Sequence, residues 1–197
     1  RVPGNPAQFV VKGRGYEIDA LALMQPKDMV TCDLEGYWID GPPESSQCFE
    51  IKMHSAIYKE HPEVNSIVHV HPRYTTMMSV LEKTLVPMCN EGIHLVRTPL
   101  PVYPHSKLIL TEEDGQGVAS TIGDSPAALL RGHGAVTTGT RLEQSVMNML
   151  QLEEQAKMNW YAYCAAGPDY KGIPEADIVE ADAQPTLADL PHFAGGP

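Results

Sequence analysis

The sequence has no cluster of basic residues. Fourteen Lys and Arg stand against 25 Asp and Glu, which gives a formal net charge of −11. Nucleic acids and anionic membrane surfaces are bound through gathered cations. The composition therefore disfavours both as partners and indicates a small-molecule ligand.

Long apolar runs and paired cysteines are also missing. No apolar stretch reaches the roughly 18 residues of a membrane span, and Cys32, Cys48, Cys89 and Cys164 lie far apart without a CxxC pair. The opening residues, RVPGNPAQFVVKG, read as a turn and a strand rather than a signal peptide. We expect one domain in a reducing cytoplasm, with the cysteines packed in the core. The abrupt start predicts that residues are missing upstream.

The spacing of apolar residues predicts short strands up to residue 40 and a helix after them. The strand-like segments are QFVVKG, ALALM and DMVTCDLEGYWI, divided by turns that contain Gly or Pro. In SSQCFEIKMHSAIYKEHP the period becomes helical, with Ser45 or Ser46 as the N-cap. On that helix Glu50 and His54 would lie one turn apart on the same face.

Further along the chain, two more helices and an irregular tail are predicted. Pro72 suits the first turn of a short helix. Thr140 and Glu143 form a capping box before a long helix, which Gly167 ends. Between these helices, PAALLRGHGAVTTG reads as two strands separated by a histidine. Residues 167–197, rich in Pro, Ala and Asp, are predicted to be irregular.

Two histidines stand two residues apart in NSIVHVHPRYTTMMSVL. Alternate side chains of a strand face the same side, so His69 and His71 point one way while Val68 and Val70 point the other. A single buried His is more often a hydrogen-bonded core residue than a ligand. Two on one face can reach one metal ion at about 2.0–2.1 Å. The pair therefore predicts part of a metal site.

A third ligand must come from a distant segment. His133 is the best candidate, because the glycines on both sides in RGHG let its backbone approach another element. It also stands at the end of a predicted strand, where sites tend to form. Glu50 can supply a fourth contact or act as a general base.

These pieces resemble the class II aldolase and adducin family, from Phe9 to about Ala166. Its pattern is a Glu one helical turn before a His, then H-x-H, then a distant H-G. The resemblance implies that His69, His71 and His133 bind a divalent metal beside Glu50. Zinc or manganese is expected, although three imidazoles also accept iron or cobalt.

The resemblance also implies a fold and an assembly. We expect an α/β protein, a three-layer α/β/α sandwich with a mainly antiparallel central sheet, and a homotetramer with active sites between subunits. Family members carry helices and a G-N-x-S-x-R segment ahead of the first strand. Arg1 matches the last residue of that segment, so the N-terminal helices are expected to be missing. Residues 1–166 would form the family domain.

Two reactions of the family suit such a centre. One is retro-aldol cleavage of sugar phosphates, with a related epimerisation, and the other is decarboxylation of hydroxylated aromatic or pyridine carboxylates. The aldolases hold phosphate with patterns such as T-P-S-G and S-S-E, where this chain has VKGRGYE and SSQCFE. Their catalytic Tyr is matched here by Asn90 or Glu91. These departures favour a metal-dependent carboxy-lyase, acting through a metal-stabilised carbanion or enolate in aromatic catabolism.

This hypothesis assigns roles to five further side chains. Arg14, between two glycines, would fork onto a carboxylate of a small anionic substrate, although a solvated turn residue is as good a reading. Glu50 or His105 would deliver the proton that replaces carbon dioxide. Arg73 and Glu91 would line the substrate pocket, although surface packing explains Arg73 equally well.

Three other functions remain open from the sequence. A sugar-phosphate aldolase or epimerase would use the same metal. A non-haem iron oxygenase on this fold would consume oxygen. An adducin-like binding module would have no chemistry, yet such members lack the metal histidines that are retained here.

Overall fold

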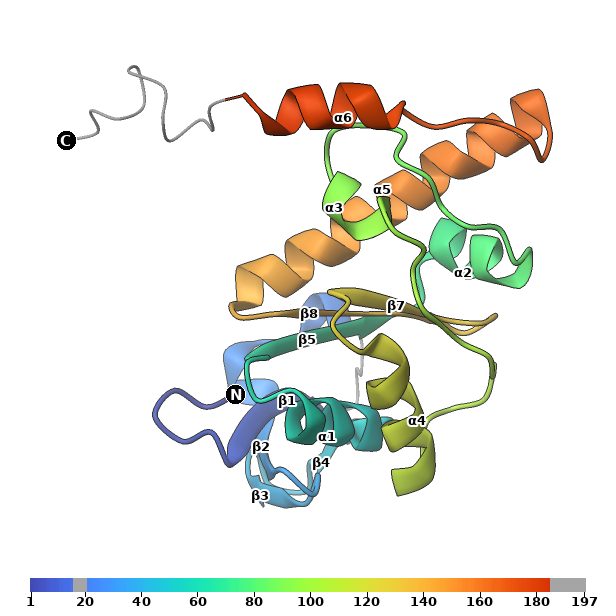
Figure 1. The fold of residues 1–197 in the computed structure, drawn as a ribbon. Coiled ribbons are helices and arrows are strands. Elements are labelled where there is room, and N and C mark those ends of the chain that lie inside the picture. Colours follow the sequence, from blue (N-terminus) through green and yellow to red (C-terminus); the bar gives the residue numbers. More distant parts are fainter. Residues whose placement is uncertain (16–20, 185–197) are drawn as a thin grey trace.

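The computed structural model describes residues 1–15 and 21–184 of the chain. Its strands form two four-stranded sheets, and helices cover both faces of the second sheet (Figure 1). The helices on one face are α2 (Arg73–Val80), α3 (Ile93–Val96) and α5 (Leu142–Ala166). Those on the other face are α1 (Ile51–Glu60) and α4 (Glu112–Ile122). The predicted α/β/α sandwich is confirmed, because the second sheet is mainly antiparallel and lies between two layers of helices, and the other strands form a further sheet.

The first sheet is built from the N-terminal part of the chain. Its strands are β1 (Gln8–Arg14), β2 (Met29–Asp33), β3 (Trp38–Asp40) and β4 (Ser46–Gln47), in the antiparallel order β3-β2-β1-β4. Alternate residues of β1 and β2 are buried in the core beneath. The strands predicted in QFVVKG and DMVTCDLEGYWI are therefore confirmed.

The strand predicted in ALALM is wrong. Leu21–Leu23 is a 3-10 turn, η1, followed by a second one, η2 (Pro26–Asp28). Both edges of β1 are already paired, with β2 and with β4. The segment therefore has no place beside β1, and the side chains of Leu21 and Leu23 are exposed.

The second sheet separates two hydrophobic cores. Its strands are β5 (Ser66–Val70), β6 (Val102–Tyr103), β7 (Ala127–Leu130) and β8 (Gly134–Gly139), in the order β5-β8-β7-β6, with only β6 and β7 parallel. Along β7, Ala128 and Leu130 join the core under α1 and α4, whereas Ala127 and Leu129 join the core under α2 and α5. This period of two is what a strand covered on both faces requires.

Helix α1 begins later than the sequence indicates. Ser46 lies in β4, and the hydroxyl of Ser45 donates to the carbonyl oxygen of Pro42, so neither caps the helix. The pairing of β4 with β1 keeps this segment extended, and Glu50 becomes the N-cap residue of α1. A contact between segments distant in sequence thus overrides the local helical period.

The long helix α5 is confirmed, but its predicted capping box does not form. Arg141 is the N-cap residue, and Thr140 instead bonds through its amide and its hydroxyl to the side chain of Gln144. Gly167 ends the helix as expected. All four cysteines are free, and the expectation of core packing holds for Cys32, whereas Cys164 is exposed.

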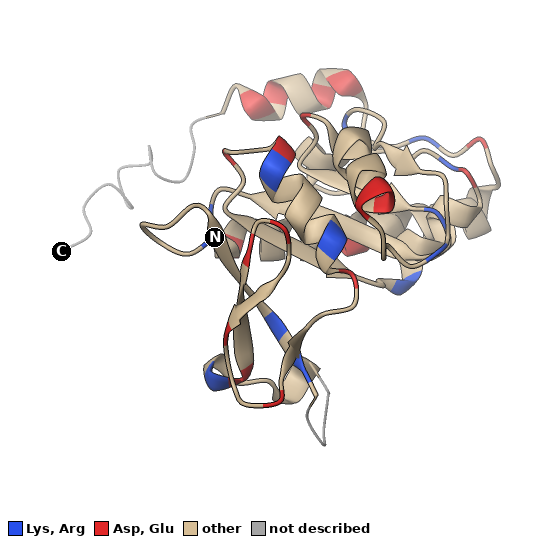
Figure 2. Ribbon diagram, turned by 90° about the horizontal axis from the view of Figure 1, so that it is seen from below, with Lys and Arg blue, Asp and Glu red and all other residues tan. Residues whose placement is uncertain are grey.

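The tail predicted to be irregular contains helix α6 (Glu175–Asp182), which is a correction. Its Ile178 is buried, and Arg97, at the C-cap of α3, pairs with Glu175 and with Asp182 at 2.7 Å. Figure 2 shows acidic positions repeated along α6 and basic positions spread over several elements. Residues 185–197 of the predicted tail lie outside the described residues. Among the helices described, none has the length and apolar character needed to cross a membrane.

Candidate metal centre

The histidine pair lies where the sequence places it. His69 is in β5 and His71 follows the end of that strand, while Val68 and Val70 pack into the core on the opposite face. The ring centroids of His69 and His71 are 5.1 Å apart. The same-face expectation is therefore confirmed.

His133 approaches the pair because β5 and β8 are antiparallel neighbours. Val70 pairs with Ala135, which brings the start of β8 beside the end of β5. The ring centroid of His133 lies 5.1 Å from that of His69 and 4.8 Å from that of His71. A Cβ atom on Gly134 would stand 2.4 Å from the carbonyl oxygen of Val70, so only glycine permits this approach.

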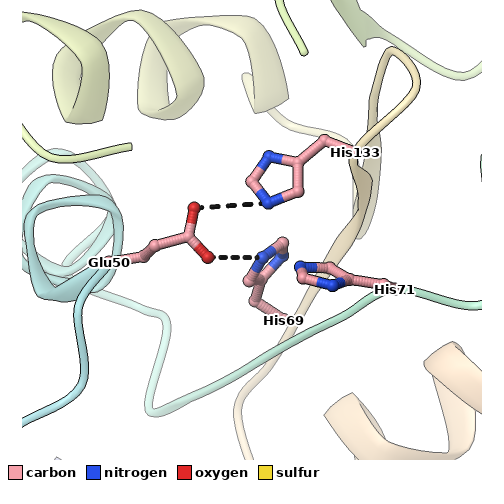
Figure 3. A group of neighbouring side chains, drawn as sticks. All are labelled: Glu50, His69, His71 and His133. Carbon is pink, nitrogen blue, oxygen red and sulfur yellow. Dashed lines mark hydrogen bonds and ion pairs between the residues drawn. The ribbon is translucent and has the colours of Figure 1, made fainter. Parts of the chain in front are cut away.

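Glu50 reaches the histidines from the N-terminus of α1. Its carboxylate does not cap its own helix. Instead, Oε1 accepts a hydrogen bond from the amide of Ile109 at 3.0 Å, and Oε2 lies 3.1 Å from Nε2 of His69 (Figure 3). Oε1 also lies 3.4 Å from Nε2 of His133. The carboxylate therefore lies close to the imidazoles of both His69 and His133, which come from the second sheet and the loop before β8.

The hydrogen bonds of these rings fit a cation at their centre. Nδ1 of His69 lies 2.9 Å from the carbonyl oxygen of Ala135, which can only accept, so Nδ1 carries the proton. Nε2 of neutral His69 then turns a lone pair toward the carboxylate of Glu50. Two acceptors this close need a shared cation, either a second proton on the ring or a metal ion. Among the described residues, neither ring nitrogen of buried His133 has a hydrogen-bond partner, and Nε2 has only its longer contact with Glu50.

The ligand atoms of Glu50, His69, His71 and His133 all lie within 4.8 Å of one another. A tetrahedral ion with bonds of about 2.1 Å spaces its ligands about 3.4 Å apart. Small rotations of the four side chains would close that difference. His133 is buried, Glu50 and His69 are partly buried and His71 is exposed, so the group opens to solvent at His71. The residues present therefore fit a divalent metal with an accessible position.

Charges at the group also suit a cation. Burial raises the pKa of Glu50, but the rings of His133 and His69 and the amide of Ile109 outweigh it and hold the pKa well below its ordinary value. Burial, together with the neighbouring His69 and His133, lowers the pKa of His71. An ionised carboxylate beside a neutral imidazole is the protonation state that binds metal.

Four other predicted site residues lie outside this group. Arg14 ends β1 and stacks on Phe49, and Arg73 is the exposed first residue of α2. His105 is exposed on the loop after β6, edge-on to Tyr103, while the carbonyl of Glu91 accepts a hydrogen bond from Gln155. Their roles stay predictions.

The sequence did not single out the residues that hold the group in place. The amide of Ile109 and the carbonyl of Ala135 are backbone groups, and no side-chain pattern marks them. Glu153 of α5 accepts hydrogen bonds from the amides of Tyr74 and Thr75 and so caps α2, directly after the H-x-H segment. Glu153 is partly buried. An acidic residue among the inward positions of the predicted long helix was the sequence signal that could have identified it.

Comparisons with known proteins show the family and the fold of the chain. Residues 1–160 match the family described as Class II Aldolase and Adducin N-terminal domain. The 3,4-dihydroxyphthalate decarboxylase of Arthrobacter keyseri is 26% identical over 179 residues, which cover 87% of this chain and 72% of that protein. An L-fuculose phosphate aldolase of Methanococcus vannielii is 36% identical over 141 residues, which cover 71% of this chain and 72% of that protein.

A solved structure shows the same fold. The aldolase II superfamily protein from Pseudomonas syringae has a TM-score of 0.78 and 21% identity, and the match covers 98% of this chain and 76% of that chain. The layered arrangement of Figure 1 is therefore that of known aldolase II structures.

Proposed function

Because this chain belongs to the class II aldolase and adducin family, we propose that it is a metal-dependent lyase that removes carbon dioxide from a hydroxylated aromatic or heteroaromatic carboxylate. The observation that carries the metal-dependent part is the facing pair of His69 Nε2 and Glu50 Oε2, 3.1 Å apart. A second proton or a metal ion would satisfy these two acceptors, and the four ligand atoms within 4.8 Å of one another favour the metal. The carboxy-lyase part is supported by likeness to the decarboxylase of Arthrobacter keyseri over 87% of this chain.

His69, His71 and His133 would hold the ion, with Glu50 as a further ligand. A divalent ion bound there supplies a Lewis acid that draws electron density from a substrate oxygen. The exposed edge of the group at His71 admits the substrate. Zinc and manganese are our first choices for the metal.

Decarboxylation requires a proton as well as a place for negative charge. The bond between the ring carbon and the carboxylate carbon breaks, carbon dioxide leaves, and the electron pair stays on the ring carbon until a proton joins it. Glu50 is ionised because its pKa is lowered, which disfavours it as the donor. His105 then becomes the better candidate, since it lies on the loop that leads to Ile109, the residue that bonds Glu50.

A second candidate is cleavage of a sugar phosphate. The specific observation in its favour is 36% identity to the fuculose phosphate aldolase of Methanococcus vannielii, although over a smaller part of the chain. The departures at VKGRGYE and SSQCFE, where the aldolases carry their phosphate patterns, count against it. We therefore place it second.

One experiment separates the candidates. Protein loaded in turn with zinc, manganese, iron(II) or cobalt is assayed for carbon dioxide release from ortho-hydroxy aromatic acids and for aldehyde release from ketose phosphates. We expect release of carbon dioxide only. Activity on the phosphates alone would replace the proposal by the aldolase, and oxygen uptake with iron(II) would indicate an oxygenase. Neither activity, with no metal retained, would leave a binding module.

We also propose that the chain assembles with copies of itself. Leu142, Val146 and Leu150 recur every four residues along α5, and 67%, 40% and 60% of these side chains are exposed. An apolar stripe of this kind is typical of a subunit interface. Light scattering should give the mass of a tetramer, and a monomer would reject this assignment.

A further inference from the structure

One stacked pair of side chains includes the neighbour of Glu50 in the chain. The guanidinium carbon of Arg14 lies 3.2 Å from the centroid of the Phe49 ring. Phe49 directly precedes Glu50, and 63% of its side chain is exposed. A single exposed apolar side chain is common on protein surfaces. What distinguishes Phe49 is the guanidinium that lies over its ring.

The backbone holds both residues of the pair firmly. Arg14 pairs with Ser46 across β1 and β4, and Phe49 follows that strand by two residues. Gly15, with φ +100°, turns the chain after Arg14 so tightly that a Cβ atom would stand 2.8 Å from the carbonyl oxygen of Glu44. The stack is thus built on paired strands and a fixed turn, which position side chains more precisely than a free loop.

The donors of Arg14 are unused within the described residues. Arg1 donates to four backbone carbonyls, and Arg97 pairs with two carboxylates. In residues 1–15 and 21–184, by contrast, the guanidinium of Arg14 makes no hydrogen bond and no ion pair, and it stacks on Phe49. Stacking covers a face of the guanidinium and leaves the N–H groups at its edge available.

We propose that Phe49 determines substrate specificity by holding the Arg14 guanidinium flat, so that its edge donors bind a carboxylate of a planar substrate in a fork. This inference rests on the proposed function and adds the residue that selects the substrate. A planar carboxylate matches the two parallel N–H groups of the fork. The remaining surface of the phenyl ring favours a flat aromatic substrate. The ring itself offers no donor to a phosphate. Because a guanidinium fork pairs with phosphate as well as with carboxylate, the choice between the two falls to the phenyl surface.

The test compares binding and turnover in metal-loaded variants. Phthalate and inorganic phosphate are titrated calorimetrically into the wild type, Phe49→Ser, Phe49→Tyr and Arg14→Lys. Phe49→Ser should weaken phthalate binding by about 5- to 30-fold, the range of a partly desolvated cation–π contact. Phe49→Tyr should restore binding, because the ring is kept. Arg14→Lys should lose binding similarly, because the ammonium lacks the planar fork.

Two controls separate specificity from folding. Tyr37 is 65% exposed and also lies beside a cation, Lys52, at 5.2 Å, so Tyr37→Ser is a matched loss of an exposed aromatic ring. It should leave phthalate binding unchanged. The double variant Phe49→Ser/Arg14→Lys should lose little more than either single variant, because the two residues act as one unit.

Kinetics with 3,4-dihydroxyphthalate provide a second readout. KM should rise more than kcat falls in Phe49→Ser, whereas a general structural defect would lower kcat and the metal content together. The inference is overturned if the wild type does not bind phthalate or if Phe49→Ser binds it normally. It is also overturned if the loss of affinity in the double variant equals the product of the losses in the two single variants. Carbon dioxide release with unaltered KM in Phe49→Ser rejects only this inference. Loss of phthalate binding in a protein that releases no carbon dioxide upholds it and rejects the proposed reaction.

Discussion

Gly134 and Val70 touch so closely that a single methyl group on Gly134 would stand 2.4 Å from the carbonyl oxygen of Val70 and 2.8 Å from Cδ2 of His71. This contact joins the H-x-H strand to the strand that follows His133. The distances among the three rings therefore depend on the absence of one side chain.

The first prediction follows from that contact. Gly134→Ala should lower the free energy of unfolding by about 1–3 kcal/mol, the usual cost of an overfilled interior, and should weaken metal binding because β5 and β8 must separate. Denaturant unfolding and metal titration measure the two effects. Gly4→Ala is the control: its φ of +76° costs alanine some backbone strain, but a methyl group there meets nothing within 4 Å, so metal binding should be kept. An equal loss in both variants would show that the close approach does not matter.

A second prediction concerns the ligands. His71→Ala should weaken metal binding by at least about 100-fold, as loss of a direct ligand exceeds the effect of losing an outer partner. His94→Ala, which removes an exposed imidazole bonded to Asn148, should retain the metal. Elemental analysis after dialysis measures the metal content of each variant. Metal at 100 times the dissociation constant of the wild type should also add about 2.7 kcal/mol to the stability of the wild type and at most about 0.4 kcal/mol to that of His71→Ala. Full occupancy in His71→Ala would reject the site.

The third prediction is a pH dependence away from the metal. The ion pair with Lys107, 2.5 Å long, and the contact with Thr111 hold the pKa of Asp114 below its ordinary value. A lowered carboxyl pKa stabilises the folded state above the unfolded-state pKa of about 3.8, and this contribution is lost as pH falls through the folded-state pKa. Between pH 5 and pH 2, the melting temperature of the wild type should therefore fall more than that of Asp114→Asn. Parallel curves would contradict the assignment.

A fourth prediction tests the cap on α2. Glu153→Ala removes the acceptor for the amides of Tyr74 and Thr75 and for the hydroxyl of Thr75, and should cost about 1–2 kcal/mol. Glu154→Ala is a matched control one residue along, because Glu154 is exposed and contacts Lys157 on its own helix. Thermal unfolding compares the two. If both variants have the same melting temperature, the hydrogen bonds of Glu153 do not stabilise α2.

The sequence predicts the histidines of the centre well, because their arrangement depends on local rules. A period of two places His69 and His71 on one face of the strand. The glycines beside His133 indicate that its backbone lies close to another element. Both rules act over a few residues, and the structure agrees with them.

The setting of Glu50 was harder to predict. Phe49, Met53 and Ile57 repeat with a helical period, yet Phe49 lies outside α1 and is exposed. The pairing of β4 with β1 determines where α1 begins, and it joins residues more than thirty positions apart. The same holds for the amide of Ile109, whose distance to Glu50 no pattern of side chains encodes.

The division of the strands into two sheets determines where substitutions would act. The three histidines belong to the second sheet and its ends, whereas Arg14 and Phe49 belong to the first sheet and the loop that follows it. Glu50 directly follows Phe49 and connects the two parts. Exchanges at Arg14 or Phe49 can therefore alter the reactant while the three imidazoles stay in place, but a displacement of β4 would move the carboxylate as well.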